Sequence, residues 1–191
     1  LILNELFFSF SNFDIKTNSL DLIFTLMCII SLILALNMFD GINLQSGIFY
    51  LLFFLFCAFV TKNSFFMLII IPILFFLYLN FKNKTFLGDS GSYLLSFLVC
   101  FFSIKIYKYE SLIYADHIFT ILFLPIVDAA RVTLQRIYSE RKIFEPDKIH
   151  FHHLLLSKYN YTSTIIIISV FFLFPYLCFF FKINSILTIT V

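Results

Sequence analysis

Three of the chain's four histidines lie within four positions, in the stretch PDKIHFHHLLL at 146–156. His150, His152 and His153 follow a basic segment that includes Arg136. Imidazole and guanidinium groups donate hydrogen bonds to phosphate oxygens, so this pattern favours recognition of an anion such as a diphosphate. Zinc is the alternative, because histidine is a common zinc ligand. The basic neighbours would repel a dication, and simple packing against the next helix is a third interpretation.

A second motif, NMFDGIN at 37–43, closes a long apolar run with amides and a carboxylate. Asn37, Asp40 and Asn43 are spaced by three, which places them on one face if the helix continues through them. Gly41 is expected to supply the positive φ that stops a helix. The alternative is an ordinary helix end with polar caps.

A third motif, FLGDSGS at 86–92, brackets Asp89 with Gly88 and Gly91 at the expected start of a helix. Backbone N–H groups are unsatisfied there, so Asp89 could serve simply as an N-cap. Glycines on both sides also allow a phosphate or a hydrated cation to approach the backbone. One carboxylate with phosphate oxygens and waters is a common way to hold Mg²⁺.

The fourth motif, DAARVTLQR at 128–136, places Asp128 and Arg131 three residues apart after Pro125. Charges at membrane depth are costly and usually face a partner or a polar cavity. Two interpretations stay open at this point. The pair is either a structural ion pair that positions the helix or a direct contact with substrate.

The elements that must carry these motifs are apolar helices. The chain is 61% hydrophobic and 13% charged, whereas soluble domains average about 45–50% apolar and about 25% charged. Its uncharged runs are long enough to cross a bilayer and apolar all round, which argues against a soluble bundle. We therefore predict an all-α, polytopic transmembrane helix bundle, a single integral-membrane domain over 1–191 with a motif loop at 135–160. About six helices are expected, at approximately 22–39, 47–60, 64–79, 90–107, 117–134 and 162–181.

These spans divide the loops between the two sides of the membrane. The side that receives all four motifs carries eight Lys and Arg residues and the other side five. The positive-inside rule makes the first side cytoplasmic. The eight are Lys82, Lys84, Arg131, Arg136, Arg141, Lys142, Lys148 and Lys158, and the five are Lys16, Lys62, Lys105, Lys108 and Lys182.

Four motifs, over about residues 20–160, resemble those of the polyprenyl-phosphate N-acetylhexosamine-1-phosphate transferases of glycosyltransferase family 4. In chain order they are NMFDGIN, FLGDSGS, PIVDAARVTLQRI and FEPDKIHFHHLLL. The His-x-His-His form is similar to the undecaprenyl-phosphate GlcNAc-1-phosphate branch. The resemblance implies transfer of N-acetylhexosamine-1-phosphate, GlcNAc-1-phosphate in that branch, from a UDP-sugar to a polyprenyl phosphate, with release of UMP. It also implies a bacterial inner-membrane enzyme with a cytoplasmic site that initiates cell-envelope polysaccharides such as O-antigen.

The resemblance also implies residue roles. Asp89 would bind Mg²⁺, or Mn²⁺ in its place, and would be catalytic together with Asp40. Substrate-binding roles would fall to Asn37, Asn43, Asp128, Arg131, Arg136, His150, His152 and His153, the histidines holding the uridine diphosphate with Arg136 behind them.

The chain departs from the family pattern in two places. The usual DGIDGL is DGINLQ here, so Asn43 replaces a carboxylate with an amide that is neither a base nor an anionic ligand. The family's adjacent Asp-Asp pair is also missing from these residues. We expect that pair in a preceding N-terminal portion, which makes these 191 residues the C-terminal part of a larger transferase that does not turn over alone.

Two other classes are weighed beside the enzyme: a polytopic transporter and an inactive structural homologue. A transporter predicts broken helices and polar residues near the bilayer midplane, whereas the spans here are nearly unbroken apolar runs apart from Pro72. The expected partners are a UDP-N-acetylhexosamine, a polyprenyl phosphate and the membrane. No nucleic acid is expected, and the protein partner considered is a second copy of the chain in a homodimer.

Overall fold

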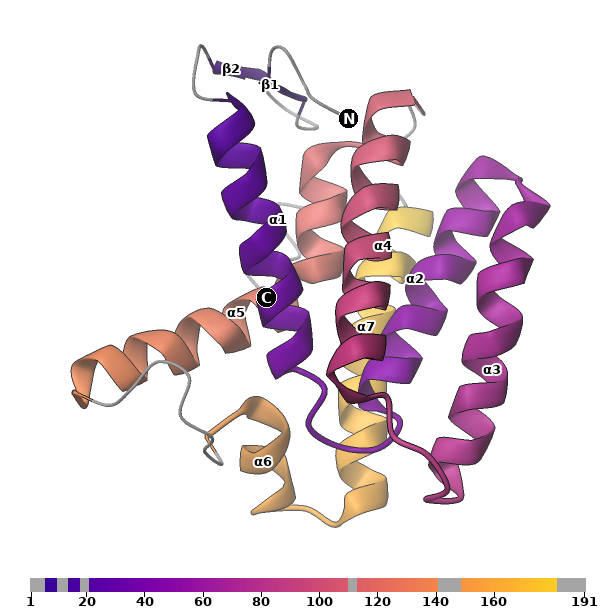
Figure 1. The fold of residues 1–191 in the computed structure, drawn as a ribbon, viewed down its shortest axis with the longest axis vertical. Helices are drawn as coiled ribbons and strands as arrows, with labels where there is room; N and C mark the ends of the chain where they lie inside the picture. The colour runs from indigo at the N-terminus through magenta and orange to yellow at the C-terminus, as the bar shows by residue number, and fades with distance from the viewer. Residues whose placement is uncertain (1–5, 10–13, 18–20, 110–112, 141–148, 182–191) are drawn as a thin grey trace.

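The computed structural model describes residues 6–9, 14–17, 21–109, 113–140 and 149–181, and side chains at 23–108, 113–140 and 149–181 (Figure 1). Two short strands precede a series of helices. The elements are β1 (Leu6–Ser9), β2 (Asp14–Thr17), α1 (Asp21–Met38), α2 (Gln45–Thr61), the 3₁₀ turn η1 (Ser64–Phe66), α3 (Met67–Phe81), α4 (Gly88–Tyr109), α5 (Ala115–Tyr138), α6 (Phe151–Leu156) and α7 (Tyr161–Phe180).

The predicted all-α membrane bundle is confirmed, and its six long helices lie within a few residues of the expected spans. Four of the described segments are long and apolar enough to cross a membrane: 64–81, 88–108, α5 and α7. The apolar helices α1 and α2 are shorter. Their length is near the lower end of the roughly 17–25 residues that span a bilayer.

The hairpin of β1 and β2 was not predicted. The two strands pair antiparallel, with Leu6 opposite Thr17 and Ser9 opposite Asp14. Each strand has only four residues, too few for a period-two pattern to stand out from the apolar background. The hairpin caps one end of the bundle beside α1 (Figure 1).

Aromatic side chains fill the core. Phe172 of α7 meets Phe39 and Phe49 edge-on, with ring centroids 5.6 and 5.3 Å away. Phe102 of α4 meets Phe66 in the same way at 4.8 Å. Edge-to-face pairs of this kind add about 0.5–1.5 kcal/mol to the stabilisation that comes from burying apolar area. The phenylalanines therefore stabilise one particular packing of the helices.

Large apolar side chains also cover the outside of the bundle. On α3, Leu68, Ile71 and Phe75 are between 63% and 69% exposed. An exposed apolar surface of this extent is costly in water and is the normal lipid-facing surface of a membrane helix. The outward faces of α3 and α7 therefore face lipid.

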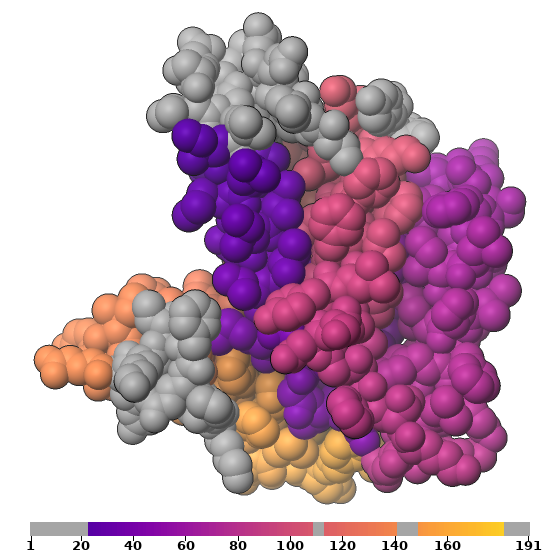
Figure 2. All heavy atoms as spheres, in the orientation of Figure 1, coloured from indigo at the N-terminus to yellow at the C-terminus, as the bar shows by residue number. Residues whose placement is uncertain are grey.

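Helix α5 changes direction along its length. Its first half runs with the bundle, and its second half turns sideways and projects from the lower part of the molecule (Figures 1 and 2). Pro125 lies inside this helix, where proline removes one backbone hydrogen bond and is the usual cause of a sharp kink. The bend carries Asp128 and Arg131 out of the bundle axis.

The polar segments meet at one end of the bundle. The α1–α2 connection, the α3–α4 connection and α6 all lie at the lower end in Figure 1, below the projecting half of α5 or beside it. The two predicted carboxylate motifs and the histidine segment are thus at the same end.

Candidate active site

A polar cleft of about 430 Å³ lies between the α1–α2 and α3–α4 connections. Its lining includes Asn37, Asp40, Gly41, Asn43, Asn80 and Asp89. Asn37 Nδ2 donates a long hydrogen bond, 3.4 Å, to Asp89 Oδ1, which joins motifs 52 residues apart in sequence. The structure therefore brings the NMFDGIN and FLGDSGS motifs to one site.

Asp40 is the more enclosed of the two carboxylates in this cleft. Burial raises the pKa of Asp40, a hydrogen bond from the Ser46 hydroxyl lowers it, and the nearby charge of Asp89 raises it again. Two carboxylates that face one cleft repel each other, and a bound cation would relieve that repulsion.

The backbone of the first motif differs from the sequence expectation. Helix α1 ends at Met38, so Asp40 and Asn43 lie in the connection and not on a continued helix face. The left-handed residue is Leu44, with φ 71°, and Gly41 is not among the residues with positive φ. Asn80 stabilises this turn, because its Oδ1 accepts a hydrogen bond from the Leu44 N–H at 2.6 Å.

An amide clamp, formed by Asn43, Asn80 and Asn83, holds the two connections together. Asn43 Nδ2 donates to Asn83 Oδ1 at 2.6 Å, and Asn80 Nδ2 donates to Asn43 Oδ1 at 3.2 Å. Asn80 also donates to the carbonyl oxygen of Thr85 at 2.8 Å. Asn43 uses both ends of its amide, and the bond to Asn83 needs an N–H that a carboxylate does not have.

Asp89 lies in the first turn of α4, as predicted, and is exposed to the cleft. Gly88 has φ 68°, a conformation that favours glycine. Gly91 has a different reason to be glycine, because a Cβ there would lie 2.8 Å from Cδ1 of Leu87. Of these two glycines Gly88 lines the cleft, and Gly91 makes room for the side chain of Leu87.

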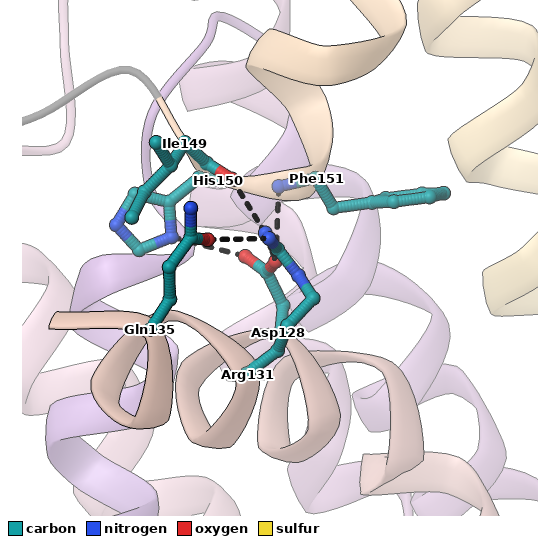
Figure 3. Close-up of polar contacts among 6 residues, drawn as sticks. All are labelled: Asp128, Arg131, Gln135, Ile149, His150 and Phe151. Carbon is teal, nitrogen blue, oxygen red and sulfur yellow. Dashed lines mark hydrogen bonds and ion pairs between the residues drawn. The ribbon is translucent and has the colours of Figure 1, made fainter. Parts of the chain in front are cut away.

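The histidine segment forms a second polar cluster against α5 (Figure 3). Asp128 is 3% exposed and forms an ion pair of 2.8 Å with Arg131. His150 Nδ1 lies 3.0 Å from the other carboxylate oxygen of Asp128. The structural ion pair is thus the arrangement that the structure shows for Asp128 and Arg131, and it also includes a histidine.

His152 is the most enclosed of the three histidines, 1% exposed, and neither ring nitrogen has a hydrogen-bond partner among the described residues. Burial lowers the pKa of His152 to about 4, helped by the neighbouring His153 and His150. Its ring lies directly against the first motif: a Cβ built on Gly41 would lie 2.0 Å from His152 Nε2. This contact joins the histidine segment to the loop that carries Asp40.

The remaining predicted site residues occupy different positions. His153 is half-buried, with its ring centroid 4.3 Å from that of His152. Arg136 is 3% exposed and lies within α5, not in the predicted loop from 135. The basic residues Arg141, Lys142 and Lys148 lie outside the described residues.

Fold and site together define an integral-membrane protein with a polar, carboxylate-bearing cleft at one end of its helices. The sequence model of glycosyl transferase family 4 matches residues 2–107, just over half of the chain. The chain belongs to glycosyl transferase family 4 and is a membrane-embedded transferase of sugar phosphates. The match ends before α5, so it covers both cleft motifs but not the histidine segment. No curated protein and no solved structure gives a significant match.

Sequence reasoning missed four residues that shape the cleft. Ser46 donates to Asp40, Asn80 and Asn83 complete the clamp, and the Tyr161 hydroxyl donates to the carbonyl oxygen of Asn43 at 2.7 Å. Asn80 and Asn83 lie three positions apart at the end of a long apolar run, and this spacing was a signal for the clamp. Nothing in the sequence points to Tyr161, because it lies 118 positions from its partner.

Proposed function

We propose that this protein transfers N-acetylhexosamine-1-phosphate, with GlcNAc-1-phosphate as the favoured substrate, from a UDP-sugar to a polyprenyl phosphate. A phosphate oxygen of the lipid attacks the sugar-bound phosphorus, the bond from that phosphorus to UMP breaks, and UMP leaves. The products are UMP and a polyprenyl-diphospho-sugar. The transferase class follows from the family, and the UDP-sugar, the undecaprenyl chain and the envelope polysaccharide are parts of the proposal.

One observation carries the proposal most directly. The cleft brings Asn37, Asp40 and Asp89 together, and the Gly41–His152 contact joins it to the histidine segment. Carboxylates on one side and imidazoles on the other suit a ligand that is a diphosphate with a counter-cation.

The cleft residues fit Mg²⁺, or Mn²⁺ in its place. Asp89 and Asp40 offer carboxylate oxygens and Asn37 an amide oxygen, which are ligands that these hard cations prefer. Among the described residues no group of three His, Cys, Asp or Glu side chains forms a metal site, so phosphate oxygens and waters would complete the coordination. When bound, the cation would neutralise charge on the diphosphate.

The histidine segment would hold the diphosphate itself. His152 has two buried ring nitrogens without partners among the described residues. Buried polar atoms are normally hydrogen-bonded, so a ligand or a water is the expected partner here. His153 follows His152 in α6, and Arg136 belongs to α5, whose Asp128 contacts the histidine segment; both would contribute donors. An imidazole donates to a phosphate oxygen with about 1.5–3 kcal/mol of net stabilisation.

The lipid chain has a site of suitable chemistry. An apolar cavity of about 280 Å³ lies between α1, α4 and α5, with Leu32, Ile104 and Ile126 in its lining. Its polar lining is minimal, as expected for a hydrocarbon ligand. It would take a stretch of the polyprenyl chain.

The deciding experiment is exchange of labelled UMP into UDP-GlcNAc, with the protein at its full natural length, polyprenyl phosphate and Mg²⁺ or Mn²⁺. We expect exchange that requires both the cation and the lipid. Asp89→Asn should abolish it or change the metal requirement, because the variant removes a charge from the proposed cation site. A panel of UDP-sugars identifies the donor.

Three outcomes would contradict the proposal. A folded preparation without exchange under any divalent cation indicates an inactive homologue. Uptake of a labelled substrate into vesicles without a lipid-linked product indicates a transporter. Activity that chelation removes and zinc alone restores indicates a zinc site at the histidines.

A further inference from the structure

Asp128 is buried and uses both carboxylate oxygens. Oδ1 accepts hydrogen bonds from Arg131 Nη2 at 2.8 Å and from the backbone N–H of Phe151 at 2.9 Å. Oδ2 lies 3.0 Å from Nδ1 of His150. Donors of the protein thus already engage both oxygens, and a carboxylate has no proton to donate to an anionic diphosphate, so Asp128 does not suit direct contact with that ligand.

The partners of Asp128 hold three consecutive residues of the histidine segment. His150 is held by its side chain and Phe151 by its N–H, both directly. Ile149 is held through Arg131, whose Nη2 donates to its carbonyl oxygen at 2.5 Å. Figure 3 shows the contacts of His150 and Phe151 ending on the Asp128 carboxylate and that of Ile149 ending on Arg131. The backbone is therefore fixed immediately before α6 starts.

Asp128 also supplies a cap that α6 lacks locally. His150 is the N-cap residue, and its side chain makes no capping hydrogen bond. The first N–H groups of a helix have no partner within the helix, and a carboxylate is the favoured acceptor for them. Asp128 satisfies the N–H of Phe151 from another element, and this sets the rotation of the short helix that carries His152 and His153.

The proton on His150 follows from the same geometry. An ionised carboxylate only accepts hydrogen bonds, so Nδ1 of His150 must be the donor toward Asp128. In the neutral imidazole the other nitrogen, Nε2, is then an acceptor, and in the protonated ring it is a donor. In Figure 3 the second ring nitrogen of His150 points away from Asp128.

We propose that Asp128 is a positioning residue: it accepts the Nδ1 proton of His150, so that in the protonated ring Nε2 donates to an anionic ligand, and it holds the segment that carries the three histidines without touching the ligand itself. This assignment deepens the proposed function, on which only its ligand-binding part rests. The tautomer of His150 and the cap of α6 are properties of the protein alone.

The test variant is Asp128→Asn. Its Oδ1 still accepts from Arg131 and from the Phe151 N–H, so the backbone contacts remain. Its amide NH₂ now faces Nδ1 of His150, which must become an acceptor, and the proton moves to Nε2. The matched control is Asp116→Asn, a second buried aspartate of α5, 5% exposed, beside His117 with a closest distance of 3.8 Å.

The first measurement is the His150 tautomer, from ¹⁵N shifts of histidine-labelled protein at high pH, where imidazoles are neutral. His150→Gln assigns the signal. We expect Nδ1–H in the wild type and in Asp116→Asn, and Nε2–H in Asp128→Asn. A wild-type signal with the proton on Nε2 overturns the proposal whether or not the variant folds, and so does an unchanged tautomer in folded Asp128→Asn.

The second measurement is binding of UMP to the full-length protein. Asp128→Asn removes the negative charge that favours the protonated His150 ring, and we expect UMP affinity to fall roughly ten- to 150-fold, the cost of losing a hydrogen bond to a charged phosphate, with no loss in Asp116→Asn. In a His150→Ala background the loss should nearly vanish, because Asp128 acts through that ring. Additive losses would mean that Asp128 contacts the nucleotide directly, which overturns the proposal. If wild-type protein binds no UMP, the proposed function fails while the tautomer result still stands.

Discussion

Gly41 and His152 bring the two halves of the site together. A methyl group on Gly41 would lie 2.0 Å from Nε2 and 2.2 Å from Cε1 of His152. The ring is 1% exposed, and a methyl group at position 41 would overlap with its present position. We expect Gly41→Ala to displace His152 and to weaken UMP binding roughly ten- to 150-fold, the cost of losing a hydrogen bond to a charged phosphate. Isothermal titration calorimetry with UMP measures this loss of affinity.

Gly47→Ala is the control for that experiment. A Cβ at Gly47 would lie 2.6 Å from Cδ2 of Leu77, an apolar side chain of α3. Overpacking of this kind costs about 1–3 kcal/mol of stability. This variant should therefore unfold at a lower temperature and keep its UMP affinity. Equal affinity in Gly41→Ala and the wild type would mean that His152 does not bind the nucleotide.

Asp40 gives a prediction about pH. Its pKa is raised by burial, and the hydrogen bond from Ser46 acts in the opposite direction because it favours the charged form. Ser46→Ala removes that bond, so the Asp40 pKa should rise further. If the carboxylate binds Mn²⁺, the pH below which Mn²⁺ is released should move upward in Ser46→Ala. Electron paramagnetic resonance of Mn²⁺ measures the midpoint, and an unchanged midpoint would place the cation away from Asp40.

At the scale of the elements, the amide clamp fixes how the α1–α2 and α3–α4 connections sit beside each other. We expect Asn43→Ala and Asn83→Ala each to lower the free energy of unfolding by about 1 kcal/mol, measured by thermal unfolding. The coupling energy between the two substitutions should be of similar size. Asn43→Asp should also destabilise the clamp, because a carboxylate cannot donate to Asn83 unless that amide turns over. Additive effects of the two alanine variants would show that the clamp does not stabilise the protein.

The elements also show where sequence patterns were sufficient. Apolar runs of helical length predicted the six long helices, since a membrane helix must be apolar over its full length whatever its neighbours are. The end of α1 at Met38 was not predicted, because the turn depends on Asn80 from another helix. The sideways course of α5 had a visible cause in Pro125, but its direction depends on packing that one sequence does not display.

The site follows the same division. Residue types alone pointed to Asp40, Asp89 and the histidines as polar groups in an apolar chain. Which of them touch was not predictable: the joining contacts, Asn37 with Asp89 and Gly41 with His152, connect residues 52 or more positions apart. For Asp128 the sequence left two interpretations, an ion pair with Arg131 or a contact with substrate, and the structure shows the ion pair. A spacing of three permits such a pair, but it does not reveal that His150 also contacts Asp128.

At the scale of the whole molecule, the excess of Lys and Arg predicts that the cleft end faces the cytoplasm. In a background without the native cysteines, a cysteine in place of exposed Lys84, near the cleft, should react with a membrane-impermeant maleimide only after the cells are permeabilised. A cysteine in place of exposed Lys62, at the opposite end of α2, should react in intact cells. The reverse pattern of labelling would invert the orientation.

The contact between Gly41 and His152 has a consequence for how the protein is made. Ribosomes add about 5–20 residues per second, so His152 is synthesised on the order of ten seconds after Gly41. Once Asp89 has been synthesised, the growing chain holds all residues that line the Asp40 cleft but does not yet hold His152, which follows with α6. If His152 binds the nucleotide as proposed, a chain that ends before α6 should bind none.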